Sequence, residues 1–204
     1  MVNAAKFALL LASLGCALYG FRQGATAGGI PPDVPQYTSA GQLQFPAGYR
    51  DWVFLSSGMD MSYAKGVPSG DMHVFENVFV NDASYRAFQT TGTWPDKTIL
   101  VTEFRNAQGK GSINQSGRFQ TGLMGFDIHV KDGKRFRGGW GFFAFDTPGK
   151  SAALIPAAAA CYTCHAAHGA VDNTFVQFYP TLLPIATAKK TLGHAYLSDN
   201  AGSR

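Results

Sequence analysis

Short apolar runs that end in turn-forming residues recur along the chain and predict β-strands. Each run holds β-branched and aromatic residues over the length of a typical strand. Four segments have this pattern: 73–80, 98–105, 123–130 and 140–145. The polar, glycine-containing segment 106–116 joins the second run to the third, and we expect a hairpin loop there with antiparallel pairing of its two strands.

Helical patterns are fewer. Asn81 suits the start of a helix over residues 83–90, in which Tyr85 and Phe88 fall on one face. The alanine-rich segment 152–167 predicts a second helix, although it contains a proline. We therefore expect the α+β class, with mainly an antiparallel β-sheet and a few helices. Three other segments have no clear pattern: 49–55, which fits a helix or a strand, 59–71, which fits a loop, and 177–184, which is irregular.

The first 27 residues have the features of an export signal. A basic start with Lys6 precedes an uncharged, mostly apolar run over residues 7–21, and the A-x-A pattern Ala25-Thr26-Ala27 follows. This order predicts a cleaved signal peptide over residues 1–27, a periplasmic protein and no membrane span in the mature chain. Two alternatives stay open: the apolar run is retained as an anchor, or the chain is cleaved and lipid-modified at Cys16.

Composition narrows the range of functions. The net charge of +4 is too small, without a clustered basic face, to predict nucleic-acid binding. Hydrophobic residues make up 46% of the chain and charged residues 15%, as in a folded domain with a core. Cys16 lies in the predicted signal, so two of the three cysteines remain, Cys161 and Cys164, and a disulfide framework is not expected.

Cys161, Cys164 and His165 form the motif C-x-x-C-H. Two thiols three residues apart lie on one side of a helical turn, where they can add to the vinyl groups of a haem. The next residue can place its imidazole beneath the iron. The alternatives are a redox-active dithiol, which would need a βαβ pattern around it, and half a zinc site, which would need further ligands. We expect one covalently attached haem c per chain, with His165 as the iron ligand.

No methionine follows His165, although an electron-carrying cytochrome usually has an axial methionine downstream of its haem motif. The methionines of the mature chain all lie upstream: Met59, Met61, Met72 and Met124. The motif also comes late, after a long β-rich stretch. These features predict a haem with an open distal side, which binds or transforms small molecules.

Several stretches between about residues 47 and 187 follow the pattern of a known family in order. They are Tyr49-Arg50-Asp51-Trp52, residues 78–104, Gly125-Phe126-Asp127, residues 130–136, residues 140–143, residues 161–165 and Phe178-Tyr179-Pro180. On these residues the chain resembles the cytochrome P-460 family, which includes the cytochromes c′-beta. The resemblance implies an antiparallel-sheet fold, a homodimer and one c-type haem. Members of the P-460 branch oxidise hydroxylamine, and members of the c′-beta branch bind nitric oxide at a five-coordinate haem.

Three features bear on which branch the chain follows. In the P-460 branch a lysine is cross-linked to the haem, and Thr102 stands at that position, so the resemblance implies no cross-link. Asp127 stands where the branch has a distal glutamate that accepts protons. Strand alternation places Leu100 and Phe104 on the face of Thr102. Such apolar walls favour a neutral diatomic ligand over water and anions.

Several polar residues have a second, plainer interpretation. Arg50 could steady a distal anion or a haem propionate, or be an ordinary surface arginine. By alternation alone, Asp127 and His129 belong to the solvent face of a strand, and only the resemblance brings Asp127 into a pocket. The same rule makes Glu103 and Arg105 an exposed pair.

The resemblance also completes the domain organisation. Residues 28–46 are rich in proline, glycine and serine and predict a linker or a surface arm. Residues 47–190 form the predicted P-460-like haem domain, and the polar residues 191–204 predict a flexible tail.

Three functions remain open. The first is c′-beta-like binding of nitric oxide by an exported monohaem protein. The second is hydroxylamine oxidation with Asp127 as the proton acceptor, so whether the chain is an enzyme stays undecided. The third is electron transfer, which only the haem motif supports. The expected partners are a small-molecule ligand, an electron-transfer partner and a second copy of the chain.

Overall fold

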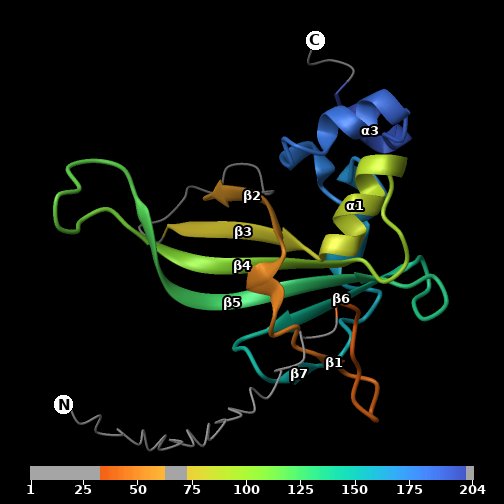
Figure 1. Ribbon diagram of the computed structural model, residues 1–204, viewed down its shortest axis with the longest axis horizontal. Helices are drawn as coiled ribbons and strands as arrows, with labels where there is room; N and C mark the ends of the chain where they lie inside the picture. Colours follow the sequence, from red (N-terminus) through yellow and green to blue (C-terminus); the bar gives the residue numbers. More distant parts are fainter. Residues whose placement is uncertain (1–32, 63–72, 201–204) are drawn as a thin grey trace, which may run out of the picture.

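A five-stranded antiparallel sheet is the centre of the computed structural model, which describes residues 33–62 and 73–200 (Figure 1). The strands lie in chain order: β2 (Val53–Met59), β3 (Val74–Val80), β4 (Ile99–Gln108), β5 (Phe119–Lys131) and β6 (Trp140–Phe145). Because each strand pairs with its neighbour in the sequence, the sheet is a meander built from local connections. A small second sheet joins β1 (Leu43–Gln44) to β7 (Ser151–Ala152).

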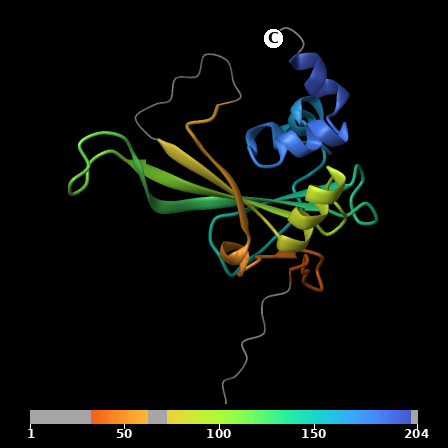
Figure 2. The ribbon, with the colours of Figure 1, turned by 45° about the horizontal axis from the view of Figure 1, so that its top comes forward.

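In the part of the chain that the structure describes, four α-helices accompany the sheet, which confirms the predicted α+β class. They are α1 (Asp82–Thr91), α2 (Ala160–His168), α3 (Leu183–Lys189) and α4 (His194–Asp199). Two short 3-10 helices, η1 (Tyr49–Asp51) and η2 (Val176–Phe178), complete the elements. Figures 1 and 2 show α1 and the C-terminal helices gathered at one end of the sheet. None of the helices in the described ranges is long and apolar enough to span a membrane.

The sequence pattern located the strands better than the helices. The four predicted strands correspond to β3, β4, β5 and β6, although β4 and β5 are longer than expected and make the hairpin arm at the left of Figure 1. The predicted helix over residues 152–167 is shorter, since α2 begins only at Ala160. Residues before it pair with β1 instead, and Pro156 lies in between. Proline removes a helix hydrogen bond, so the later start is expected physically.

The two faces of the sheet are covered by different parts of the chain. On one face, Phe45 and Tyr49 from the N-terminal arm and η1 pack against β4, β5 and β6. On the other, α1 and the C-terminal segment pack around Leu100 and Phe142. Since both faces are covered, β4 begins with three consecutive buried residues, Ile99, Leu100 and Val101, rather than with a strict alternation.

The ends of the chain differ in part from the expectation. The described part of the arm over residues 28–46 is tied down, because Leu43 and Phe45 are buried. The predicted tail over residues 191–204 contains α4, which lies against α2, and His168 Nδ1 is 2.8 Å from Asp199 Oδ2. The predicted signal peptide over residues 1–27 lies outside the described residues.

Candidate functional site

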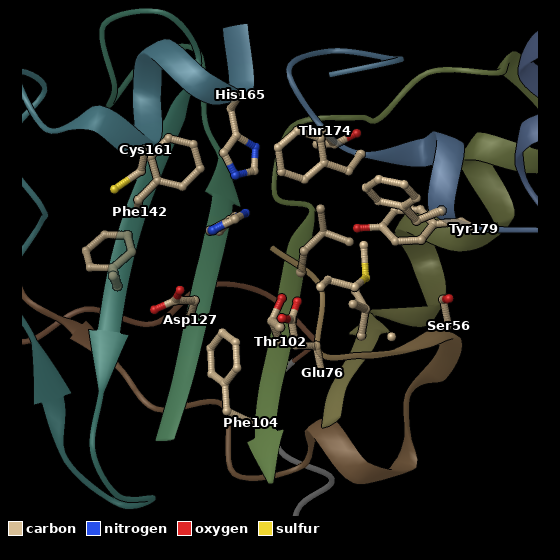
Figure 3. A pocket seen from close by; sticks show the side chains of 18 of the residues that line it. Ser56, Glu76, Thr102, Phe104, Asp127, Phe142, Cys161, His165, Thr174 and Tyr179 are labelled. Atoms are coloured by element: carbon tan, nitrogen blue, oxygen red, sulfur yellow. The ribbon is translucent and has the colours of Figure 1, made fainter. Parts of the chain in front are cut away.

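A cavity of about 190 Å³ lies between the sheet and the C-terminal segment (Figure 3). Side chains from all five strands of the main sheet form one wall. The opposite wall comes from α2 and from residues 174–179, including Cys161, His165 and Phe175. Residues of the C-x-x-C-H motif and the candidate residues on the strands therefore line the same cavity.

His165 is held in one orientation on the cavity wall. Its Nδ1 lies 2.8 Å from the backbone carbonyl oxygen of Asn173, an acceptor that fixes the proton on Nδ1. The other ring nitrogen, Nε2, is left with a free lone pair, as a metal-ligating histidine requires. A Cβ at Gly169 would lie 2.7 Å from the His165 carbonyl oxygen and from the Asn173 backbone, so only glycine allows the Asn173 segment so close.

The segment that carries Asn173 is itself anchored to the rest of the domain. Asp172 accepts a hydrogen bond from the Trp94 backbone N–H at 3.0 Å, and its carboxylate lies 2.9 Å from Lys131 Nζ. The Trp94 indole N–H donates to the Thr174 hydroxyl at 2.8 Å. These bonds fix the segment that orients His165 to the sheet and to the turn after α1. No local sequence pattern indicates a role for any of these residues.

Aromatic rings surround the imidazole of His165. The centroid of its ring lies 4.2 Å from that of Phe175, 4.9 Å from that of Phe142 and 4.8 Å from that of His129. Burial lowers the pKa of His165, against the smaller opposite effect of the Asn173 hydrogen bond. The imidazole is thus kept neutral, the form that binds a metal.

The two cysteines of the motif are both free thiols on α2. Cys161 lines the cavity and is exposed, and Cys164 is half-buried one helical turn later. With the free Nε2 of His165 and the largely apolar walls, the donor set fits a covalently attached haem. In residues 33–62 and 73–200, no group of three or more His, Cys, Asp or Glu side chains could hold a metal ion on its own.

The sheet brings most of the sequence-predicted residues to this cavity. Leu100, Thr102 and Phe104 all line it, which confirms that alternation places them on one face. Asp127 also lines it, from β5, where it is the cross-strand partner of Thr102. His129 follows on the same face, so the plainer interpretation of Asp127 and His129 as solvent-facing is wrong. The helices and the C-terminal segment cover this face, which strand alternation cannot reveal.

Burial changes the ionisation of the polar groups in the cavity. It raises the pKa of the Asp127 carboxyl, and it raises the pKa of Glu76, which the charge of Asp127 raises further. The pKa of His129 lies well below its ordinary value because of burial and of the nearby His165. Each shift disfavours the charged form of the group.

Arg50 is not brought to the cavity. Its Nη2 lies 2.8 Å from both carboxylate oxygens of Glu103, which projects from the opposite face of β4. The Tyr49 hydroxyl donates to the same carboxylate at 2.8 Å, and Arg105 is also bonded to it. Glu103 is fully buried, so its interpretation as part of an exposed pair is wrong. The 3-10 helix η1 covers this carboxylate, a long-range contact that no local pattern signals.

Sequence reasoning missed two further polar residues of the cavity, Glu76 and His129. For Glu76 a signal was present, because it is the one acidic residue in the otherwise apolar and β-prone run over residues 73–80. A carboxylate at the centre of such a run faces either solvent or a polar cavity. Met61 also lines the cavity. Nothing about its position in the sequence predicts this.

Comparison with known proteins identifies the family of this domain. Residues 46–176, more than half of the chain, match the family model described as Cytochrome P460. The matched range holds every strand of the main sheet and the complete C-x-x-C-H motif, and membership implies a haem cofactor. No curated protein matches the chain. The chain belongs to the cytochrome P460 family.

Proposed function

We propose that the protein is an exported c-type monohaem protein that binds small nitrogen-oxide ligands, with nitric oxide as the first candidate. One observation carries this proposal. The Nε2 atom of His165 belongs to a neutral, oriented imidazole on one wall of a cavity, and uncharged side chains, including Leu100, Thr102 and Phe104, make up most of the facing wall. The protein thereby provides one strong iron ligand and leaves room for a small one.

The residues of the chain have distinct tasks in this proposal. A haem bound here supplies an iron that takes the small ligand. Cys161 and Cys164 would hold the macrocycle through thioether bonds, and the Asn173 carbonyl keeps His165 oriented and would make its Nε2 a better donor. The apolar side chains of Leu100 and Phe104 disfavour water beside a neutral diatomic ligand. Thr102, which stands at the position of the cross-linking lysine of the P-460 branch, lines the cavity.

Hydroxylamine oxidation is the second candidate, and Asp127 favours it. Its carboxylate lies in the cavity beside Thr102, and its pKa is raised, as suits a group that accepts a proton near neutral pH. Electron transfer is the third candidate. Met61 favours it, because a thioether in the same cavity offers the kind of axial ligand that electron carriers use.

A ligand titration tests the first candidate against the second. The haem-loaded, reduced protein is titrated with nitric oxide, and turnover of hydroxylamine is measured with an artificial electron acceptor. The proposal predicts tight nitric oxide binding and negligible turnover. Turnover that is lost in Asp127→Ala would instead establish the enzyme.

We also propose a homodimer in the periplasm. The family resemblance suggests the dimer, and exposed apolar side chains on the edge strand β2 support it, since Phe54 is 53% and Met59 46% exposed. Measurement of the molecular mass in solution tests it. A monomer at micromolar concentration would overturn this part of the proposal.

A further inference from the structure

Glu76 brings a second carboxylate into the cavity that holds Asp127. In the register of the sheet, Glu76 on β3 pairs with Phe104 on β4, and Thr102 on β4 pairs with Asp127 on β5. The two carboxylates therefore come from the strands on either side of β4 and project from the same face. Figure 3 shows both of them in the cavity together with Thr102.

Among the residues that the structure describes, neither carboxylate has a compensating charge. Within the described ranges no hydrogen bond or ion pair is formed by either side chain, and no Lys or Arg lines the cavity. The other titratable groups in the lining are His129 on β5, Cys161 and His165 on α2, and Tyr179 beyond η2. Both histidines have lowered pKa values, which favours their neutral form, and no Lys or Arg of the described residues lines the cavity beside the pair.

A buried pair of carboxylates without a cation distinguishes ligands by their charge and by their hydrogen-bond donors. A negative charge in a half-buried cavity repels a bound anion more strongly than it would in water, since the local dielectric constant is lower. A neutral ligand that carries N–H or O–H groups can instead donate hydrogen bonds to a carboxylate, and such charge-assisted bonds are strong. Desolvation raises the pKa of both Glu76 and Asp127, and the charge of Asp127 raises that of Glu76 further.

We propose that Glu76 is a specificity-determining residue of this cavity, and that with Asp127 it selects neutral, hydrogen-bond-donating nitrogen ligands of the hydroxylamine class against anions. This inference rests on the proposed haem site, because it concerns ligands that reach the iron. Nitric oxide is uncharged and has no donor, so the pair neither excludes nor attracts it.

Azide and hydroxylamine binding to the ferric, haem-loaded protein test the inference at pH 7 and fixed ionic strength. We expect Glu76→Gln and Asp127→Asn each to bind azide about tenfold more tightly, the size of effect that removal of one charge about 12 Å from the ligand gives at an effective dielectric constant of about 20. We expect hydroxylamine to bind several-fold more weakly to both variants. Asp146→Asn is the matched control, because it removes one exposed carboxylate outside the cavity and should leave both affinities within about twofold.

Two further measurements keep the outcome clear. Azide affinity of the unmodified protein should rise with salt, because screening weakens the repulsion, and this arm needs no variant. Nitric oxide binding to the ferrous protein should stay within about threefold in every variant, since a neutral diatomic feels little of either charge. Equal azide affinity in Glu76→Gln, Asp127→Asn and the unmodified protein would overturn the inference while the proposed function stands. Absence of nitric oxide binding in the unmodified protein would overturn both.

Discussion

The two faces of the sheet hold carboxylates in opposite ways. Glu103 is fully buried on one face and is bonded to Tyr49, Arg50 and Arg105. Asp127 and Glu76 face the cavity on the other side, where no Lys or Arg of residues 33–62 and 73–200 lines the cavity. A buried charge that is fully paired is part of the structure, whereas one left open to a cavity costs stability and is typical of a functional site. The presence or absence of a cationic partner, rather than burial alone, therefore distinguishes a structural carboxylate from a functional one.

The same contrast separates residues that lie next to each other in the chain. Thr102 faces the cavity and Glu103 the packed arm, because successive side chains of a strand point to opposite faces. A substitution on the packed face should therefore change the stability of the fold, and one on the cavity face should change ligand binding.

Replacement of His165 by alanine should abolish iron ligation by the protein. Because Cys161 and Cys164 are unchanged, the haem should stay covalently attached. The optical spectrum before and after addition of imidazole checks this, since exogenous imidazole should restore the ligated spectrum. A variant with an unaltered spectrum would show that His165 is not the iron ligand.

Glu103→Ala should destabilise the fold by about 3 to 5 kcal/mol, since it leaves two arginines and a tyrosine hydroxyl without their shared acceptor. Urea unfolding measures the change in the free energy of unfolding. Asp146→Asn, which removes an exposed carboxylate, should change it by less than about 0.5 kcal/mol and serves as the control. A loss below about 1 kcal/mol for Glu103→Ala would contradict the structural role of this face.

Asp127→Asn and Glu76→Gln should each stabilise the protein by about 1 kcal/mol at pH 7, because each removes an uncompensated charge from the cavity. The sign follows from linkage. Both carboxyls have a higher pKa folded than unfolded, so the folded state holds more protons between the two values. Stability is therefore lost as pH rises from the ordinary carboxyl pKa through the raised one. In the variant that carries both substitutions, the free energy of unfolding should not show this decline with pH. If it does, these two carboxyls are not its cause.

Arg50→Ala should cost about 1 kcal/mol or less, because its side chain is 55% exposed and Glu103 keeps Arg105 and Tyr49. Nitric oxide and azide affinities should not change, since Arg50 and the cavity lie on opposite faces of the sheet. A tenfold change in either affinity would restore the sequence-based expectation that Arg50 acts on a bound ligand.

The sequence predicted what depends on local pattern. The run Trp140–Phe145 is a strand with the predicted ends, and the C-x-x-C-H motif lies on α2, where Cys161 and His165 line the cavity. Alternation correctly grouped Leu100, Thr102 and Phe104. It failed for Glu103 and His129, because their surroundings come from η1, α2 and the C-terminal segment, which lie far away in the chain. Which face of a strand is buried depends on those long-range contacts.

The spectrum of the reduced, haem-loaded protein with and without nitric oxide tests the central claim most directly, that His165 supplies the one protein ligand in a cavity open to small molecules. We predict a five-coordinate, high-spin ferrous spectrum without the red shift of a cross-linked macrocycle, and a complete change when nitric oxide is added. A six-coordinate, low-spin ferrous spectrum that nitric oxide leaves unchanged would contradict the claim.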